Sequence, residues 1–393
     1  MRLPRGFIAS GVRAGIRKRR PDLAMIVAPG KAAAAAIFTT NRFLAAPVVL
    51  SRAALAKSGG KVTGVLINAG CANALTGRKG LNAARRVRAR AARLLDCPAE
   101  EVFLASTGTI GSTLPEAAIR RALPMSITRL SVSGIDAASR AILTTDAGPK
   151  VAGATLKWGR RRGRVIGMAK GAGMIHPDMA TMLSFVMTDA PATPAFLKKA
   201  LVSAADKSFH AISVDGDTST NDTVLLLASG KLGGPPMRSM RAAADFVRAL
   251  TDVCRALATM IVRDGEGATR VMAIEIRGAR SKHDARLAAN AVATSPLVKT
   301  ALYGGDPNWG RILAAVGRSG ARLSTKRVWL KAGNLVLVQN GEPAEYAEER
   351  AAQIFAKELV PLVIDLGTGK ETASLMTCDL GHDYVTLNAD YRT

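Results

Sequence analysis

Short apolar segments bounded by glycine, proline or polar residues recur along the first half of the chain, and this pattern predicts β-strands. Between them, apolar residues at three- and four-residue steps predict helices over residues 82–95 and 115–123, and Pro115 suits a first helical turn. The predicted strands of this half are residues 23–27, 34–39, 47–50, 64–68 and 102–105. Strands and helices therefore share this part of the chain.

The second half continues this mixture. Thr193 is placed to cap a helix that runs to about residue 208, and further helices are predicted over residues 240–263 and 342–355. The predicted strands are residues 182–187, 271–276, 328–331, 335–338 and 372–378. Because a regular strand–helix–strand alternation is absent, we predict the α+β class, with mixed or antiparallel sheets faced by helices. No repeat or low-complexity linker separates the two halves, so we expect them to pack as one body.

The composition of the 393-residue chain is that of a globular protein, with 48% hydrophobic residues available for a core. No apolar run reaches about 18 residues, and the first residues lack the apolar region of a signal peptide. We therefore expect a cytoplasmic protein with no membrane partner. The four cysteines and four histidines are scattered without metal-ligand spacing, which predicts reduced thiols and no metal site.

The net charge of +25 arises from 55 Lys and Arg residues against 30 Asp and Glu residues. So basic a balance is found in proteins that bind nucleic acids or membrane surfaces. In residues 83–93, however, the arginines alternate with Ala and Val as on a solvent-exposed helix face, and aromatic residues make up only 4% of the chain. Single-strand binding platforms need stacking aromatics, so we expect no nucleic-acid partner. We interpret the charge as solvated surface that attracts carboxylate substrates.

Residues 170–185 carry the strongest chemical signal. A segment rich in glycine and proline leads to Ala180 and Thr181, and a predicted core strand follows. A threonine in such a position can attack its own preceding carbonyl, which breaks the Ala180–Thr181 bond and makes Thr181 a new N-terminus. Its α-amine, with a pKa of roughly 7.7–8.0, can then act as the base for its own hydroxyl. On the local pattern alone, the plain start of a strand is the commoner explanation.

The sequence Lys170-Gly-Ala-Gly-Met-Ile-His-Pro-Asp-Met-Ala-Thr-Met-Leu183 resembles the self-cleavage motif of the ornithine acetyltransferase family, the glutamate N-acetyltransferases of arginine biosynthesis. Further blocks resemble the same family in the same order, at residues 45–48, 106–111, 144–146, 213–223, 306–311 and 388–393. Several blocks are long and unusual in composition, and together they span nearly the whole chain. The resemblance is therefore specific.

The resemblance implies a layered sandwich of the N-terminal-nucleophile type, cut into an alpha chain, residues 1–180, and a beta chain, residues 181–393. It implies that Thr181 takes the acetyl group from N2-acetylornithine and passes it to L-glutamate, in two acyl transfers through an acetyl-threonine ester. Some family members also use acetyl-CoA as the acetyl donor, and no motif here decides that point. Otherwise no cofactor is implied. The family's assembly of two alpha and two beta chains is carried over as an expectation.

The family's site residues match this chain at a small set of positions. Thr107 and Gly108 match the oxyanion pair, where glycine lets backbone N–H groups approach an anion closely. The positions that match substrate-binding residues are Thr144, Lys170, Thr181, Glu266, Asn388 and Thr393, with Thr145 as the nearest competitor of Thr144. A carboxylate at Glu266 suits the δ-ammonium of ornithine through a charge-assisted hydrogen bond. Residues 215–222, dense in carboxylates and hydroxyls, are interpreted as a hydrogen-bonded turn near this site.

Two other function classes stay open from the sequence. An N-terminal-threonine amidase or aminopeptidase of related architecture would share the chemistry of Thr181 but pass the acyl group to water. A basic nucleic-acid-binding protein would show a steep dependence of affinity on salt. Glu266 and the tail Asn388–Thr393, which match amino-acid binders, favour the transferase over the amidase.

Overall fold

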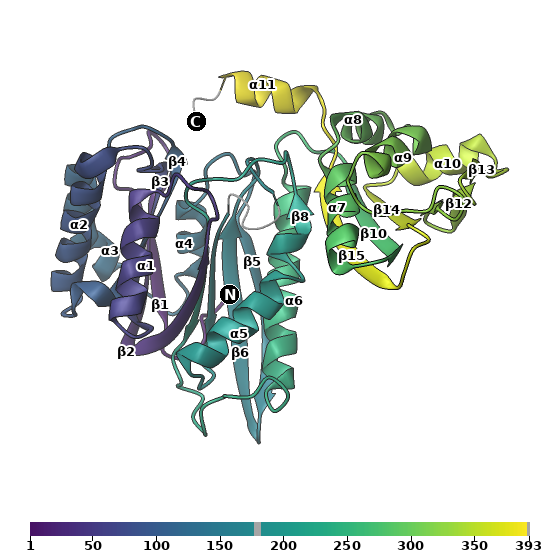
Figure 1. The fold of residues 1–393 in the computed structure, drawn as a ribbon. Helices are drawn as coiled ribbons and strands as arrows, with labels where there is room; N and C mark the ends of the chain where they lie inside the picture. The colour runs from purple at the N-terminus through teal and green to yellow at the C-terminus, as the bar shows by residue number, and fades with distance from the viewer. Residues whose placement is uncertain (177–181, 391–393) are drawn as a thin grey trace.

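The structure is a computed structural model that describes residues 1–176 and 182–390. It consists of a large lobe and a small lobe, each built on one β-sheet (Figure 1). The described strands include both parallel and antiparallel pairs, and helices pack against both sheets. The α+β class with mixed sheets, predicted from the sequence, is confirmed.

The sheet of the large lobe has eight strands in the order β4-β3-β2-β9-β7-β6-β5, with β1 paired to β2. Its strands are β1 (Ile8–Val12), β2 (Leu23–Phe38), β3 (Lys61–Cys71), β4 (Val102–Thr109), β5 (Lys150–Trp158), β6 (Arg161–Lys170), β7 (Leu183–Thr188) and β9 (Thr223–Ala228). Strands β7 and β9 run parallel to each other between β2 and β6, although they come later in the chain than all six others. The centre of this sheet therefore combines residues from both sides of position 181.

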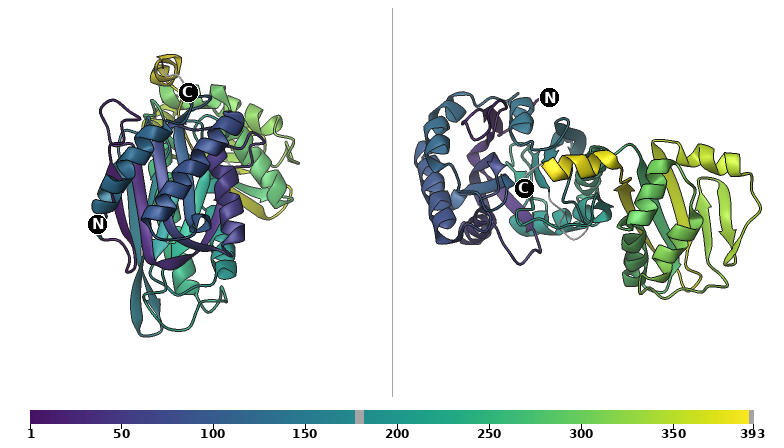
Figure 2. Two further views of the ribbon diagram at one scale, coloured as in Figure 1. Left: turned by 90° about the vertical axis from the view of Figure 1, so that its left-hand side faces the viewer. Right: turned by 90° about the horizontal axis from the view of Figure 1, so that it is seen from above.

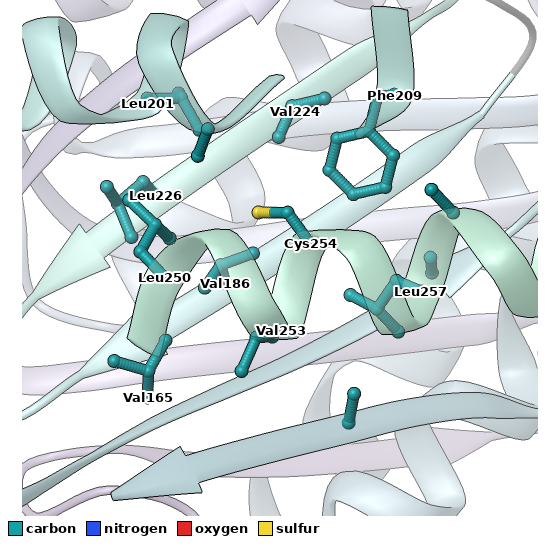
Figure 3. Close-up of a cluster of buried hydrophobic side chains, with 14 of the residues drawn as sticks. Val165, Val186, Leu201, Phe209, Val224, Leu226, Leu250, Val253, Cys254 and Leu257 are labelled. Carbon is teal, nitrogen blue, oxygen red and sulfur yellow. The ribbon is translucent and has the colours of Figure 1, made fainter. Parts of the chain in front are cut away.

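Both faces of this sheet are covered. Its helices are α1 (Ala46–Lys57), α2 (Gly77–Leu94), α3 (Glu116–Thr128), α4 (Ile135–Ala141), α5 (Pro194–Ala205) and α6 (Ala244–Arg263). Val165, Val186 and Leu226 point toward α5 and α6, where Leu250 and Leu257 meet them in a buried apolar cluster (Figure 3). Neighbouring residues of the same strands, which alternate in direction, pack against α4 and β1 on the opposite face. Because the sheet is covered on both faces, β7 and β9 are buried along their whole length and are mostly apolar.

The sheet of the small lobe has seven strands in the order β13-β12-β11-β14-β10-β15-β8. They are β8 (Ile212–Ser213), β10 (Val271–Ala279), β11 (Trp329–Ala332), β12 (Leu335–Gln339), β13 (Glu342–Pro343), β14 (Leu359–Asp365) and β15 (Glu371–Cys378). The helices of this lobe are α7 (Lys282–Ala293), α8 (Pro296–Gly304), α9 (Trp309–Gly317) and α10 (Glu348–Phe355), and all four contribute to one apolar cluster with the sheet. A last helix, α11 (His382–Asp390), extends from the small lobe toward the large one (Figures 1 and 2).

Side-chain caps fix several helix starts. The Thr193 hydroxyl accepts a hydrogen bond from the backbone of Phe196, so the predicted cap of α5 is confirmed. Ser281 and Ser295 cap α7 and α8 in the same way. Among the described residues, no helix is long and apolar enough to cross a membrane, and no three His, Cys, Asp or Glu side chains gather as a metal site would need. All four cysteines are free.

Four of the predicted elements differ in type or extent from the structure. Residues 47–50 lie in α1, because Pro47 fits the first turn of the helix and the buried residues Ala46, Leu50 and Ala54 follow a four-residue step. Residues 342–355 contain the short strand β13 before α10 begins at Glu348. The two strands predicted at 23–27 and 34–39 are one strand, β2, whose pairing with β3 shifts register between Val27 and Ala32.

Candidate active site

A cavity of about 260 Å³ is lined by residues of the large lobe and of α11. The ends of β4 and β6 contribute to its lining, together with the segment between β8 and β9, the segment after α6, and α11 itself. Its lining residues are Ala72, Thr107, Gly108, Ile110, Thr144, Thr145, Lys170, Gly173, Met174, Asp215, Asp217, Ser219, Asn221, Glu266, Tyr384 and Asn388. The cavity thus brings together every described residue that the sequence placed in the site.

The oxyanion candidates Thr107 and Gly108 lie at the end of β4, which runs parallel to β3. Gly108 has φ +124°, a conformation that side chains disfavour, and a Cβ atom there would lie 2.3 Å from the carbonyl carbon of Gly70. Only glycine fits between the two strands at this point. Its backbone therefore lies open to the cavity without a side chain to shield it.

Lys170 reaches the oxyanion candidate through the floor of the cavity. It is the last residue of β6 and only 3% exposed, and its Nζ donates a hydrogen bond of 3.0 Å to Oγ1 of Thr107. Burial lowers the pKa of Lys170, and the nearby Asp146 carboxylate works against that effect. The Lys170 amino group is thus held close to the point where negative charge would develop in an acyl transfer.

Asp146 lies behind this lysine and joins three segments. Its Oδ1 accepts hydrogen bonds from Nζ of Lys150, at 2.7 Å, and from the backbone of Gly171, at 2.6 Å. Its Oδ2 accepts one from the backbone of Thr144 at 3.0 Å. Burial alone would raise the pKa of Asp146, but the charges of Lys170 and Lys150 outweigh it and hold the pKa at about 2. Asp146 is therefore an anion that fixes both the substrate-site threonine and the loop after Lys170.

Glu266 forms the opposite wall with the last helix. Its backbone N–H donates to the carbonyl of Ala172 at 2.9 Å, and its Oε2 accepts a 2.8 Å hydrogen bond from Nδ2 of Asn388. A Cβ at Gly173 would lie 2.5 Å from the same oxygen, so only glycine leaves room for this carboxylate. Two residues far apart in the sequence, Glu266 and Asn388, therefore meet in the cavity.

The acidic turn at residues 215–222 forms a third wall. The Asp215 carboxylate accepts hydrogen bonds from the backbone N–H groups of Met174 and Ile175, the second at 2.9 Å, and from the Tyr384 hydroxyl at 3.4 Å. Burial raises the pKa of Asp215, and burial with the adjacent Asp215 also raises the pKa of Tyr384. Asp215 thus holds the loop that leads toward the predicted cleavage position.

The predicted nucleophile and cleavage site, Thr181 and Ala180, and the predicted substrate residue Thr393 lie outside the described residues. The chain is described again from Met182, whose backbone N–H donates to Oδ1 of the buried Asp222 at 3.1 Å. Both Thr144 and Thr145 line the cavity, so its lining does not separate the two.

Several residues in or behind the cavity were not singled out in the sequence. Asp146 lies behind the cavity and stands in the same short block as Thr144, directly after two threonines. Asp215 and Asn221 were recognised only as parts of a turn. Tyr384 carries no local signal at all, because its place in the site depends on how α11 returns to the large lobe.

Comparison with known proteins agrees with this geometry. The ArgJ family matches residues 8–393. The chain is 45% identical over 391 residues to the arginine biosynthesis bifunctional protein ArgJ of Chlorobaculum tepidum, covering 99% of this chain and 96% of that protein. It is 41% identical over 398 residues to the protein of the same name from Thermotoga neapolitana, with full coverage of both.

A solved structure gives the same result. The arginine biosynthesis bifunctional protein ArgJ from Bacillus halodurans is 40% identical, with a TM-score of 0.52, and the match covers 54% of this chain and 100% of that chain. The resemblance identified from the sequence is confirmed: the chain belongs to the ArgJ family.

Proposed function

We propose that this protein cleaves itself between Ala180 and Thr181 and then transfers acetyl groups from N2-acetylornithine to L-glutamate. One observation carries the proposal: the oxyanion candidates, the buried Lys170 and the Glu266–Asn388 pair line one cavity. Family membership over residues 8–393, with relatives named as bifunctional proteins of arginine biosynthesis, supports the same activity.

The chemistry follows from an N-terminal threonine. The Thr181 hydroxyl gives its proton to the free α-amine and attacks the acetyl carbonyl of N2-acetylornithine. The tetrahedral intermediate collapses by breaking the carbonyl–nitrogen bond, the protonated amine of ornithine leaves, and acetyl-Thr181 remains. The amine of glutamate then attacks this ester, and N-acetylglutamate leaves as the threonine hydroxyl is restored. Thr107 and Gly108 stabilise the oxyanion of both intermediates, and losing one such donor typically costs on the order of 10²–10³ in rate.

The charges around the cavity fit these amino-acid substrates. Glu266, Asp215 and Asp217 provide carboxylates for the δ-ammonium of ornithine. Lys170 provides an N–H donor near Thr107, on the side where an oxyanion or an α-carboxylate would lie. Thr144, Asn388 and Thr393 complete the proposed substrate contacts. Glutamate has no side-chain ammonium, so we expect its affinity to depend less on Glu266 than that of acetylornithine does.

Processing and assembly are part of the proposal. The beta chain, residues 181–393, makes up 54% of the sequence. The match to the solved Bacillus halodurans chain covers the same share of this chain, 54%, and all of that chain. We propose two alpha and two beta chains per molecule, as the resemblance implies, and a cytoplasmic location. No resident cofactor is proposed. Acetyl-CoA is the candidate second acetyl donor, since the relatives carry the name bifunctional.

The test begins with an intact mass spectrum under denaturing conditions, taken for the wild type and for Thr181→Ala. We expect two fragments that meet at Ala180/Thr181 in the wild type and one chain in the variant. Incubation with N2-acetylornithine should then add an acetyl group to the beta chain and release ornithine. A single uncut chain in both proteins would contradict the catalytic assignment.

The same preparation separates the transferase from an amidase. With glutamate present, the transferase forms N-acetylglutamate, whereas an amidase releases acetate at the same rate with or without glutamate. Replacing N2-acetylornithine by acetyl-CoA decides whether this protein uses the second donor.

A further inference from the structure

Residues Asn221 and Asp222 link two parts of the site that are far apart in the sequence. They lie in the turn that leads into β9, and both side chains are buried, with exposures of 5% and 1%. Asn221 contacts the segment that carries the oxyanion candidates, and Asp222 contacts the strand that follows the predicted nucleophile. Adjacent residues thus reach both halves of the proposed catalytic machinery.

The side-chain amide of Asn221 makes hydrogen bonds with its nitrogen and with its oxygen, and one of them reaches the segment that carries the oxyanion candidates. Its Nδ2 donates to the carbonyl of Ala72 at 2.7 Å and to the carbonyl of Ser106, directly before Thr107, at 2.9 Å. Its Oδ1 accepts a 2.6 Å hydrogen bond from the Thr220 hydroxyl, which fixes the orientation of the amide. An amide nitrogen has two hydrogens, and both are used here, so Asn221 has none left to donate to a substrate.

Asp222 contacts the residue that follows the predicted nucleophile. Its Oδ1 accepts the 3.1 Å hydrogen bond from the backbone N–H of Met182, and its carbonyl accepts one from the backbone of Thr39 at 2.9 Å. The nitrogen of residue 181 is only three covalent bonds from that of Met182, so fixing Met182 constrains where the attacking residue can be. Burial raises the pKa of Asp222 well above its ordinary value.

We propose that Asn221 and Asp222 act as a pair of positioning residues that set the distance between the oxyanion loop at Ser106–Gly108 and the strand that begins beside the nucleophile. The inference rests on the proposed function, because it assigns a role to residues that support Thr181, Thr107 and Gly108. Such a pair matters because the rate of acyl transfer depends strongly on the positions of the reacting groups. A displacement of about 1 Å can lower the rate about 100-fold.

Isosteric variants test the pair. Asn221→Asp keeps the shape but loses both donors and turns an oxygen toward two carbonyls, and Asp222→Ala removes the acceptor for Met182. We expect kcat per active site to fall about 100-fold in each, with KM for N2-acetylornithine within about threefold of the wild type. Asp222→Asn keeps a carbonyl oxygen in place, and we expect it to restore kcat to within about fivefold of the wild type.

Active sites are counted by the acetyl-enzyme formed in a single turnover, so that misfolded or uncut protein does not lower the measured kcat. Asp189→Asn is the matched control, because Asp189 is a buried carboxylate at the opposite end of β7, where it accepts from the backbone of Arg164 at 2.9 Å. We expect its kcat per active site to equal that of the wild type.

Two results would overturn the pair: a kcat per active site within about threefold of the wild type in both Asn221→Asp and Asp222→Ala, or an Asp222→Asn variant as slow as Asp222→Ala. If the stronger variants do not fold, Thr220→Val serves instead, since it only frees the Asn221 amide, and an unchanged kcat there contradicts the role of Asn221. A wild type that forms no acetyl-enzyme contradicts the proposed function itself, whereas an active wild type with unaffected variants contradicts this inference alone.

Discussion

At the scale of single residues, Asp146 is the buried carboxylate that holds Thr144, Lys150 and Gly171 in place behind the cavity. Its pKa of about 2 lies below the ordinary value of 3.8, so folding favours the ionised carboxylate. The corresponding stabilisation is complete above about pH 4 and is lost as the pH falls toward about 2, through the folded-state pKa. Because the shift is a little under two units, it corresponds to about 2 kcal/mol.

Asp146→Asn is therefore expected to lower the free energy of unfolding by about 2–4 kcal/mol at pH 7, the larger value if Lys150 and Lys170 are left poorly compensated. Urea titrations from pH 7 to pH 3 measure the free energy of unfolding of both proteins. The difference between the wild type and Asp146→Asn should become smaller below about pH 4. Asp136→Asn, which alters an exposed ion pair with the N-terminus, is the control, and it should change stability by less than about 1 kcal/mol. A gap independent of pH would argue against an ionised Asp146.

Gly108 is the second residue whose role depends on geometry. Gly108→Ala places a Cβ against Gly70 at a φ of +124°, so the oxyanion loop must shift away from β3. We expect kcat to fall by about 10²–10³-fold, as for loss of an oxyanion donor. Steady-state kinetics measure it, with Gly148→Ala as the control, since a Cβ there meets no atom within 4 Å. Equal activity of the two variants would remove Gly108 from the oxyanion role.

Some of these residues could be predicted from the sequence and others could not, for a physical reason. Thr107, Gly108 and Lys170 stand in glycine-rich blocks that a resemblance can match, and the structure brings them together. Asp146 and Tyr384 act through partners that lie far along the chain, Lys170 and Asp215 respectively. No local pattern reports such pairs, because they exist only once the sheet and the last helix are in place.

At the scale of elements, apolar runs predicted strands well where both faces are buried and poorly elsewhere. Strands β7 and β10 were anticipated, whereas the hairpin β5–β6 was missed because its tip is polar and rich in arginine. In α1 the run Pro47–Leu50 is apolar without a gap, which cannot distinguish a buried strand from a buried helix turn. Whether a buried apolar segment forms a strand or a helix thus depends on the elements it packs against, which its local composition does not show.

Helix α11 is an element that serves the site more than the fold. None of its residues is buried, and its side chains reach the large lobe through Tyr384 to Asp215 and Asn388 to Glu266. We expect deletion of residues 382–393 to change the free energy of unfolding by less than about 1 kcal/mol, because little apolar area is lost. The same deletion should raise KM for N2-acetylornithine at least about tenfold, since it removes one wall of the cavity.

Thermal unfolding and steady-state kinetics of the truncated protein check this prediction. Val385→Ser is the control for α11, because Val385 is 65% exposed and does not line the cavity. It should leave both quantities unchanged. A truncated protein with unaltered kinetics would show that α11 contributes nothing to substrate binding.

At the scale of the whole molecule, the predicted cut lies in the chain between β6 and β7, which are neighbouring strands of one sheet. Strands β7 and β9 lie after position 181, yet they pair with β6 and β2, which lie before it. The sequence predicted a strand over residues 182–187, which matches β7, but it did not predict β9. It could not give the order of the strands either, because pairing between distant segments leaves no periodic signal in either one. The order matters, since it decides whether cleavage would release a fragment.

All residues of β7 and β9 are buried, and Phe185, Val186 and Leu225 are completely inaccessible. Separating residues 1–180 from 181–393 would expose these side chains, each worth about 1.5–3 kcal/mol, and break two antiparallel ladders. We therefore expect the cut wild type to elute as one native species that contains both fragments, at the same volume as uncut Thr181→Ala. Size exclusion with native mass spectrometry measures this, and only denaturant should separate the fragments. Elution of a free fragment under native conditions would contradict the interleaved sheet, because neither part could then depend on the other for its core.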